Sequence, residues 1–449
     1  MPASDTIHDV IGVGFGPSNL ALAIALEEIV VRSGSPCDFR FIEKQNAFSW
    51  HGGMLLPDSR MQVSFLKDLV SLRDPTSPFS FVNYLHKQGR LIDFINQKTF
   101  FPSRLEFNAY LRWAAAAFDH RCCYGEEVLA VRPVEANGSV THLCVVSRTV
   151  DGAERQRQAR HLVVATGGSP HVPDVFQPRR GDARVFHSAA YLHALGRLDL
   201  GARAPSRIAV VGGGQSAAEI FLDLHERFST TSVDMIIRKH ALRPADDSPL
   251  ANQIFDPQFT DLVFHRSEAQ RRDMLREFSN TNYSVADPDL IRRIAAILYQ
   301  QKILGAARHA LLPTREVLGT EANASGVTLV LQDTVSGLVD HRTYDAVILA
   351  TGYSRDIDDR LVAGLRDQFS TLVVDRHYGI QTPANFQPSI FLQGFCETTH
   401  GLSDTLLSVL VPRAEEIARA VMRSLPSPGR MTTSRATAPT AGVLVSAAE

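Results

Sequence analysis

The chain has 449 residues, of which 44% are hydrophobic, so it is long enough for two or three domains with substantial cores. Its 46 Lys and Arg nearly balance its 48 Asp and Glu, which argues against a nucleic-acid or anionic-membrane partner. There is no signal-peptide pattern, no run of about 18 apolar residues and no C-x-x-C pair among the five Cys. We therefore expect a cytoplasmic protein without a membrane span, a disulfide framework or a metal site, whose partners are small neutral or zwitterionic molecules.

The first organised unit begins at Asp9, where an apolar strand meets a glycine turn and continues into a helical pattern. The turn contains Gly12, Gly14 and Gly16, and Pro17 stands at the third glycine position of G-x-G-x-x-G. Proline suits the first turn of a helix because its missing N–H is not needed there. A strand, glycine turn and helix in this order predict a dinucleotide site, with the pyrophosphate at the helix amino terminus.

A second strand is expected at residues 37–42, ending in Glu43. An acid at this place can accept hydrogen bonds from ribose hydroxyls. A glycine turn by itself is weak evidence, because strand-to-helix turns use Gly in any case, and Glu43 strengthens it.

The loop at residues 50–69 is neither a clean helix nor a clean strand. Two Gly, a Pro and an Asp-Ser pair interrupt its first half. In its second half Met, Gln and aromatic residues surround a single cation, Lys67. This lysine either belongs to a binding site or is a surface lysine whose stem covers apolar neighbours.

Helical patterns follow at residues 78–89 and 104–118, and strands at 128–131 and 143–147. Arg104, at the start of the second helix, is either a solvated charge or a phosphate contact, and the sequence favours the solvated charge. Residues 161–167 form an apolar strand that ends in Thr-Gly, which is typical of a buried parallel sheet.

A second nucleotide unit begins at Arg207 and contains Gly212-x-Gly214-x-x-Ala217, with the permitted Ala at the third position. Ser216 and the helix amino terminus behind it can hold phosphate. Two such turns in one chain exclude a simple dehydrogenase and imply two dinucleotides, typically FAD first and NADPH second.

The strand of the second unit at residues 233–237 ends in Arg238, Lys239 and His240 rather than in an acid. Cations at this place favour a ribose that carries a 2′-phosphate, so NADPH is expected rather than NADH. The alternative is a solvated basic loop.

Residues 241–301 are rich in turns and polar side chains, among them Asn252 and Asn282, each of which alone would be a turn former or a helix cap. Residues 345–353 repeat the apolar strand that ends in Thr-Gly, and we expect the chain to return there to the first sheet. Residues 400–410 resemble a loop that runs into a helix. After Arg423 the composition predicts a disordered tail.

These elements predict an α/β protein with two Rossmann-like domains, for FAD and NADPH, the second inserted into the first, and a small substrate-binding subdomain. The expected boundaries are 1–200 for the first part of the FAD domain and 201–344 for the NADPH domain, with substrate-contacting loops around 245–300. Residues 345–425 are expected to return to the FAD domain, and residues 426–449 form the tail.

Seven motifs in this order resemble the N-hydroxylating flavoprotein monooxygenases, the ornithine and lysine hydroxylases of siderophore biosynthesis. They are GxGPSNL at 12–20, WHxxM at 50–54, MQVSFLKDL at 61–69, GGGQSAAE at 212–219, NTNYSV at 280–285, DxxxLATGY at 345–353 and HGLSDTLLSV at 400–409. The likeness covers roughly residues 9–423, and it is much more specific than either glycine turn.

The resemblance implies a role for each matching position. Trp50, His51 and Gln62 would lie against the flavin ring. Lys67, Asn252 and Asn282 would hold the α-amino and carboxylate end of the substrate, with Asn282 also near the nicotinamide and Gln62 and Asn282 assisting catalysis. The remaining expected contacts are Ser408 with substrate and flavin, Leu406 with a cofactor, and Gln215, Ser216 and Arg238 with NADPH.

The resemblance also implies the reaction. NADPH reduces the FAD, O2 adds at C(4a) to give a hydroperoxyflavin, and the side-chain amine of L-ornithine attacks its distal oxygen. L-Lysine is the alternative substrate, because the two differ by one methylene, which is worth only about 1–3 kcal/mol in a binding site. The sequence around MQVSFLKDL and RPADDSPLANQIFDPQF favours ornithine, and the family implies a homotetramer.

Two other classes of protein share some of these features. Baeyer–Villiger flavin monooxygenases also carry two glycine turns, but their FxGxxxHxxxW motif is represented only by residues 187–191, without the FxG. The polar residues around Lys67 and the complete second nucleotide unit argue against a nonenzymatic flavin-binding scaffold.

Overall fold

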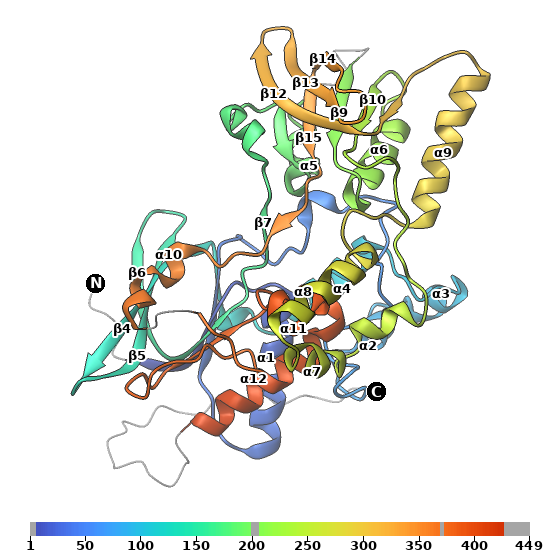
Figure 1. Ribbon diagram of the computed structural model, residues 1–449. Coiled ribbons are helices and arrows are strands. Elements are labelled where there is room, and N and C mark those ends of the chain that lie inside the picture. Colours follow the sequence, from blue (N-terminus) through green and yellow to red (C-terminus); the bar gives the residue numbers. More distant parts are fainter. Residues whose placement is uncertain (1–5, 199–205, 369–371, 426–449) are drawn as a thin grey trace.

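The two glycine turns belong to two lobes, each built around its own sheet (Figure 1). The computed structural model describes residues 6–198, 206–368 and 372–425. The predicted tail at 426–449 lies outside the described residues.

The sheet of the first lobe has seven strands in the order β3-β2-β1-β6-β5-β4, with β17 also paired to β6. The apolar strands at its centre pair in parallel, as predicted, because both of their faces are covered. Antiparallel pairing adds the more polar β5 and β4 at one edge. The strands are β1 (Ile7–Val13), β2 (Phe39–Glu43), β3 (Cys122–Tyr124), β4 (Glu126–Ala136), β5 (Ser139–Thr149), β6 (Glu154–Val164) and β17 (Ser389–Leu392).

Helices α1 and α12 pack together on the first lobe although they lie near opposite ends of the chain (Figure 1). Their contact faces are buried in one core with the central strands. The helices of this lobe are α1 (Pro17–Ser33), α2 (Phe81–Lys87), α3 (Leu91–Asn96), α4 (Arg104–Ala116), α10 (Asp359–Val362), α11 (Glu397–His400) and α12 (Leu410–Ser424). The short 3-10 helices in and beside it are η1 (Gly52–Met54), η2 (Asp119–Arg121), η7 (Ala363–Gln368), η8 (Leu402–Thr405) and η9 (Leu407–Val409).

The second lobe has a five-stranded parallel sheet in the order β11-β10-β9-β15-β8. Helices α6 and α9 pack together beside it. The strands are β8 (Val185–His187), β9 (Arg207–Val211), β10 (Ser232–Ile236), β11 (Ala310–Leu312) and β15 (Ala346–Leu349), and the helical segments are η3 (Asp174–Arg179), η4 (Ser188–Ala190), α5 (Tyr191–Leu195), α6 (Gln215–Arg227) and α9 (Pro288–Ile303).

One sequence prediction is wrong here. The strand at 346–349 does not return to the first sheet, because β15 pairs with β9 and β8 in the second. The return comes only at β17, which pairs with β6. The second sheet therefore also includes β8 and β15, both of which lie outside the predicted range 201–344.

Two features join the lobes. The short strands β7 (Ser169–Pro170) and β16 (Tyr353–Ser354) pair antiparallel where the chain passes between them (Figure 1). The helical segments η5 (Ala251–Phe255), α7 (Phe259–Phe264), α8 (Glu268–Glu277) and η6 (Phe278–Thr281) come from the inserted sequence. Of these, α7 and α8 contact α11 of the first lobe, so this insert bridges the two lobes.

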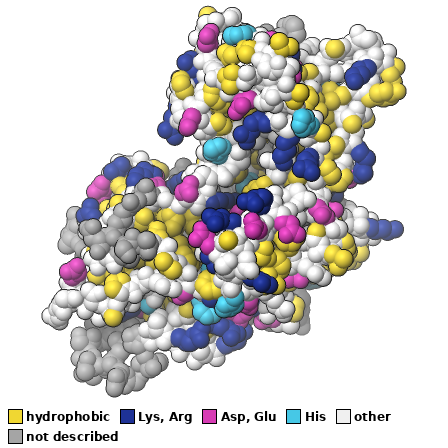
Figure 2. Space-filling model, in the orientation of Figure 1, with side chains coloured by type: hydrophobic (Ala, Val, Ile, Leu, Met, Phe, Trp, Pro, Cys, Tyr) yellow, Lys and Arg dark blue, Asp and Glu magenta, His cyan; other side chains and the backbone are white. Residues whose placement is uncertain are grey.

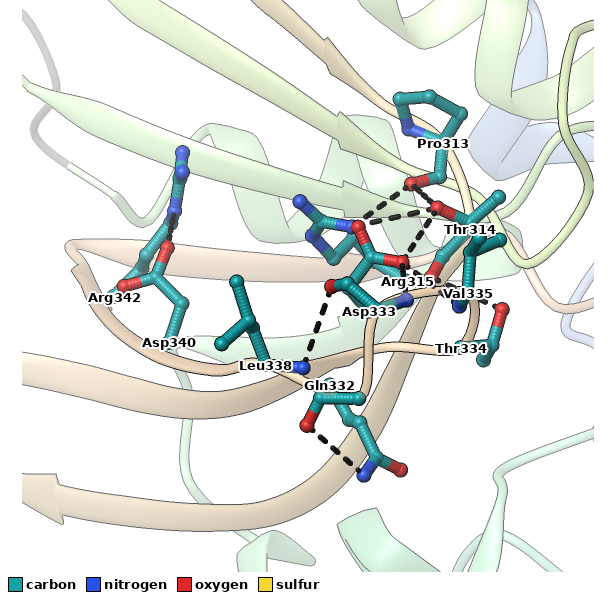
Figure 3. Close-up of polar contacts among 12 residues, drawn as sticks. Pro313, Thr314, Arg315, Gln332, Asp333, Thr334, Val335, Leu338, Asp340 and Arg342 are labelled. Carbon is teal, nitrogen blue, oxygen red and sulfur yellow. Dashed lines mark hydrogen bonds and ion pairs between the residues drawn. The ribbon is translucent and has the colours of Figure 1, made fainter.

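A three-stranded antiparallel sheet flanks the second lobe and consists of β12 (Arg315–Asn323), β13 (Gly326–Asp333) and β14 (Val339–Tyr344). Asp333 closes its turn by accepting hydrogen bonds from the backbone N–H groups of Val335 and Ser336 and pairing with Arg315 (Figure 3). The backbone hydrogen bonds, followed by Arg315, lower the pKa of Asp333 to about 2. This network stabilises the turn and includes none of the predicted site residues.

Within the described ranges, no helix is both long and apolar enough to cross a membrane. The same residues contain no group of three His, Cys, Asp or Glu side chains placed to hold a metal ion.

Three buried histidines make the fold sensitive to acid. Burial lowers the pKa of His161, His309 and His400 from 6.5 to about 4. Between these values the unfolded chain binds protons that the native chain does not, so stability falls as the pH drops from 6.5 toward 4. The coupling of proton binding to folding lowers the free energy of unfolding by about 2 kcal/mol for each histidine at pH 5 relative to pH 7.

We expect urea unfolding to show this loss as several kcal/mol. The variant His161→Asn should reduce the difference in unfolding free energy between pH 7 and pH 5, because it removes one titrating imidazole. The Asn oxygen can replace the His161 Nδ1 that accepts the Ser389 N–H, so the fold keeps this hydrogen bond. Equal unfolding free energies at the two pH values would contradict the prediction.

Candidate functional site

The first glycine turn leaves a helix amino terminus open. Helix α1 begins at Pro17, which confirms the expected proline in the first turn. Its N-cap residue is Gly16, and no side chain caps the helix by accepting its first N–H groups. A Cβ atom on Gly16 would meet no atom within 4 Å. Gly14 has φ +83°, and a Cβ there would lie 2.7 Å from the Ala165 carbonyl oxygen, so only glycine fits. The uncapped N–H groups and the open space suit a phosphate.

Glu43 is buried at the end of β2 and supports this turn. One of its oxygens accepts the Phe15 N–H at 2.7 Å, and the other accepts the Gln45 N–H at 2.8 Å. Each carboxylate oxygen can accept a second hydrogen bond. The predicted ribose contact of Glu43 stays a prediction.

The second glycine turn has the same form. Gly212 has φ +141°, and a Cβ there would lie 2.2 Å from the Ala350 carbonyl oxygen. Gly214 is the N-cap of α6 and no side chain caps it, while Gln215 and Ser216 form the first turn. This helix amino terminus also suits a phosphate.

Cations follow β10 next to the second turn. Arg238 is exposed, and Lys239 Nζ donates to the Ser284 carbonyl oxygen at 3.3 Å. Partial burial and the charge of Arg243 lower the pKa of Lys239. Lys and Arg side chains also gather where the two lobes meet (Figure 2). An anionic ligand therefore meets positive charge here despite the overall charge of −2.

The loop at 50–69 starts against α4. The Trp50 N–H donates to Asn108 Oδ1 at 2.9 Å, and the Trp50 ring meets the Phe107 ring edge to face at 5.9 Å. His51 has φ +52° and lies 4.6 Å from the Trp50 ring and 6.3 Å from the Tyr353 ring. These contacts place Trp50 and His51 where β7 and β16 join the lobes.

The His51 side chain is exposed, although the Trp50 and Tyr353 rings lie close to it. Desolvation by these surroundings, followed by the charges of Arg104 and Arg355, lowers its pKa to about 4. The imidazole is therefore neutral near pH 7.

Lys67 meets Ser408, which is distant in the sequence. Lys67 Nζ lies 3.3 Å from Ser408 Oγ and 5.8 Å from the centre of the Phe255 ring. Ser408 is buried in η9, and Leu406 is half-buried in the extended segment just before it. Burial lowers the pKa of Lys67, opposed by the charge of Asp256. The lysine is thus a half-buried cation at a junction of three segments.

The hydrogen bond of Lys67 goes to Ser408 and to neither of the two predicted asparagines. Asn252 lies in η5 with Phe255, and its Nδ2 donates to the Asp247 carbonyl oxygen at 3.0 Å. Asn282 follows η6, and the next residue, Tyr283, donates a hydrogen bond to Glu397 of α11. Their predicted substrate contacts stay predictions.

Sequence reasoning missed Asp287 and Glu219. Gln62 Nε2 donates to Asp287 Oδ1 at 3.1 Å, and Gln215 Nε2 donates to Asp287 Oδ2 at 2.9 Å and to Glu219 Oε1 at 3.0 Å. The Asp-Pro pair at 287–288, which is typical of a helix start, was the available signal for Asp287.

The expectation that Arg104 is a solvated charge is wrong. Its two terminal nitrogens donate to the two oxygens of Glu219 at 3.0 and 2.9 Å, and both side chains are largely buried. Arg104 also donates to the Met54 carbonyl oxygen at 3.1 Å. The pair therefore joins α4 of the first lobe to α6 of the second.

A buried ion pair holds the segment that carries Ser408. Arg413 of α12 donates to Asp404 Oδ1 at 2.7 Å and to Ser18 Oγ at 3.0 Å. The side chains of Arg413 and Asp404 are 2% and 0% exposed. Ser18 belongs to the first turn of α1, so this pair connects the first glycine turn with the Ser408 segment.

A cavity of about 250 Å³ lies elsewhere, between the loop that contains Asp58 and Arg60, the start of α4 and helix α9. Its lining includes both acids and arginines, among them Glu106 and Arg293, and none of the predicted site residues.

Two Rossmann units with uncapped glycine turns, in one chain with a half-buried lysine beside Ser408, define a two-dinucleotide oxidoreductase. Arg413 connects the first of these units, at Ser18, to the segment that carries Ser408, the partner of Lys67. The chain belongs to the L-lysine 6-monooxygenase/L-ornithine 5-monooxygenase family, whose sequence model matches residues 6–355.

Relatives in this family are similar to the chain in sequence and structure over nearly its whole length. The L-ornithine N(5)-monooxygenase of Pseudomonas aeruginosa is 50% identical over 423 residues, covering 94% of this chain and 95% of the relative. The solved ornithine hydroxylase from Pseudomonas aeruginosa superposes with a TM-score of 0.90 at 50% identity, covering 94% of this chain and all of that one. The ornithine N-hydroxylase of Kutzneria sp. 744, solved with reduced FAD, NADP+ and L-ornithine, has a TM-score of 0.87 at 39% identity and covers 93% and 99% of the two chains.

Proposed function

We propose that this protein is an NADPH- and FAD-dependent L-ornithine N5-monooxygenase that produces N5-hydroxy-L-ornithine for hydroxamate siderophore biosynthesis. The observation that carries the proposal is the half-buried cation Lys67, which lies 3.3 Å from Ser408 in a chain that has two nucleotide-binding turns. A substrate with a carboxylate at one end fits this cation. Relatives at 50% and 39% identity that are named for ornithine support the choice of substrate.

Each nucleotide has residues that would hold it. The first turn, Gly12 to Pro17, would bind the pyrophosphate of FAD, with Glu43 near its ribose. The second turn would bind NADPH through Gln215 and Ser216, with Arg238 at the 2′-phosphate. Bound FAD, once reduced, would supply the oxygen chemistry, so the protein needs to position groups and exclude water rather than provide a nucleophile.

The junction between the lobes would orient the substrate. Lys67 would bind the α-carboxylate, and Asn252 and Asn282 would bind its α-amino and carboxylate end. Ser408 would lie beside Lys67, close to both flavin and substrate. Trp50, His51, Gln62 and Leu406 would contact the flavin, and the neutral His51 ring adds no charge there.

The decisive assay measures NADPH oxidation and hydroxylamine product with and without L-ornithine, and with L-lysine in parallel. We expect hydroxylamine to depend on ornithine, with a higher kcat/KM for ornithine than for lysine. Absence of hydroxylamine with both amines would reject the proposal. A preference for lysine would instead support the alternative, an L-lysine N6-hydroxylase.

We further propose that the protein is a cytoplasmic homotetramer. Light scattering coupled to size-exclusion chromatography tests the tetramer, and a monomeric mass at micromolar concentration would contradict it.

Arg238→Ala should raise the KM for NADPH about tenfold, equivalent to about 1.4 kcal/mol, and leave the KM for NADH nearly unchanged. The reason is that only NADPH carries the 2′-phosphate that the guanidinium would bind. Steady-state kinetics with both nucleotides measures the effect, and Arg272→Ala, at an exposed arginine of α8, is the control. Equal increases for both nucleotides would count against the 2′-phosphate contact.

A further inference from the structure

The carboxylate of Asp287 lies between two segments that the proposed function assigns to different cofactors. One of its oxygens accepts Gln62 Nε2 at 3.1 Å, from the loop on the flavin side. The other accepts Gln215 Nε2 at 2.9 Å, from the first turn of α6 on the NADPH side. The Asp287 N–H also donates to Gln215 Oε1 at 2.9 Å, so Asp287 and Gln215 hold each other at two points.

The same network reaches the loop a second time. Gln215 Nε2 also donates to Glu219, which pairs with Arg104, and Arg104 donates to the Met54 carbonyl oxygen. The flavin-side loop is therefore held at Met54 and at Gln62, and both connections converge on Gln215. A displacement of the α6 amino terminus is thus transmitted to both ends of residues 54–62.

The chemistry of the contact requires a carboxylate. An ionised Asp has two acceptor oxygens, and here each takes one glutamine amide. An Asn at this position keeps one acceptor and replaces the other with an NH2 group, which would face a glutamine NH2 group. Gln215 is held by the Asp287 N–H, so Gln62 has to turn its amide to meet the NH2 group. The substitution therefore disturbs the Gln62 contact and removes the charge that strengthens it, while keeping the size of the side chain.

We propose that Asp287 is a positioning residue that couples the NADPH-binding turn at Gln215 to the flavin-side loop at Gln62. The inference rests on the proposed function for the identities of the two cofactors. With the carboxylate in place, the loop keeps a fixed position relative to α6. Without it, hydride transfer to the flavin slows and more NADPH is consumed without hydroxylation.

The test compares Asp287→Asn with Asp289→Asn. Asp289 lies two residues later in the first turn of the same helix, and its exposed side chain pairs with Arg292. The two variants remove the same charge from the same helix end. Each is assayed as the FAD-loaded enzyme for flavin reduction by NADPH and by dithionite, and for hydroxylamine formed per NADPH oxidised.

We expect Asp287→Asn to slow flavin reduction by NADPH about tenfold, as for the loss of a hydrogen bond to a charged group, and to lower the yield of hydroxylamine per NADPH. Reduction by dithionite and FAD content should stay at wild-type values, which a general loss of structure would not allow. Asp289→Asn should match the wild type in every assay.

A second readout does not depend on turnover. Amide hydrogen exchange of residues 54–62 should be faster in Asp287→Asn and in Gln62→Leu, and unchanged in Asp289→Asn. Because the two residues act through one contact, the double variant should exchange no faster than either single variant. Gln62 is exposed, so Gln62→Leu remains a usable test if Asp287→Asn folds poorly.

The inference would be overturned if Asp287→Asn kept the wild-type amide exchange of residues 54–62 and the wild-type yield of hydroxylamine per NADPH. Additive effects on amide exchange in the double variant would also overturn it. Failure of the proposed function is distinguishable, because the wild-type enzyme would then give no ornithine-dependent hydroxylamine at all.

Discussion

Replacing Lys67 with Ala is expected to raise the KM for ornithine about 100-fold, equivalent to about 2.8 kcal/mol at 1.4 kcal/mol for each factor of ten. The variant removes a half-buried cation 3.3 Å from Ser408, and with it the proposed partner of the substrate carboxylate. Loss of one member of a buried charge pair costs this much or more. FAD content and flavin reduction by NADPH should stay within about twofold of the wild type, because Lys67 belongs to neither glycine turn.

Steady-state kinetics over a wide ornithine range, together with stopped-flow measurement of flavin absorbance, separates these effects. The control is Lys87→Ala, which removes the same side chain from the exposed end of α2. A KM within about twofold of the wild type would show that Lys67 is a surface lysine whose stem covers apolar neighbours. A slower flavin reduction would indicate a role toward NADPH instead.

Replacing Asp404 with Ala is expected to lower the free energy of unfolding by about 3–5 kcal/mol, because it leaves the Arg413 guanidinium buried without its carboxylate. Arg413 is 2% exposed and also donates to Ser18 in the first turn of α1. The damage should therefore reach the first glycine turn, and the variant should retain less FAD after gel filtration.

Two comparisons make this result specific. Glu415→Ala breaks an exposed ion pair with Arg419 in the same helix and should cost less than about 1 kcal/mol. The double variant Asp404→Leu with Arg413→Met should be more stable than Asp404→Ala, since no unpaired charge stays buried. Denaturant unfolding measures all three variants, and an Asp404→Ala loss no larger than that of Glu415→Ala would refute the prediction.

The fold was predictable where the backbone itself restricts the choice of residue. Gly14 and Gly212 adopt positive φ beside a carbonyl oxygen, and Pro17 lacks an N–H in the first turn of a helix, where no N–H has an intrahelical acceptor. Such requirements act on a few neighbouring residues, so the strands, glycine turns and helices of both nucleotide units follow from local sequence. For the same reason the loop at 400–410 is confirmed as short turns that run into α12.

The expectations that proved wrong concern distant partners. The strands at residues 161–164 and 346–349 are both apolar and are followed by Ala-Thr-Gly, yet one belongs to the first sheet and the other to the second. Arg104 resembled a solvated helix start because its partner, Glu219, lies in the other lobe. In both cases the local sequence is compatible with more than one environment.

The amino-acid sequence alone determined the α/β class, the two nucleotide units and the isolation of Lys67 in its loop. Only the tertiary structure decided that Lys67 meets Ser408, that Asp287 joins Gln62 to Gln215, and that Asp404 and Arg413 are buried together. The physical reason is the distance along the chain over which each kind of restriction acts. Dihedral limits and burial patterns restrict residues that are neighbours in the chain, whereas a hydrogen bond across hundreds of residues depends on the path of the whole backbone and leaves no local pattern.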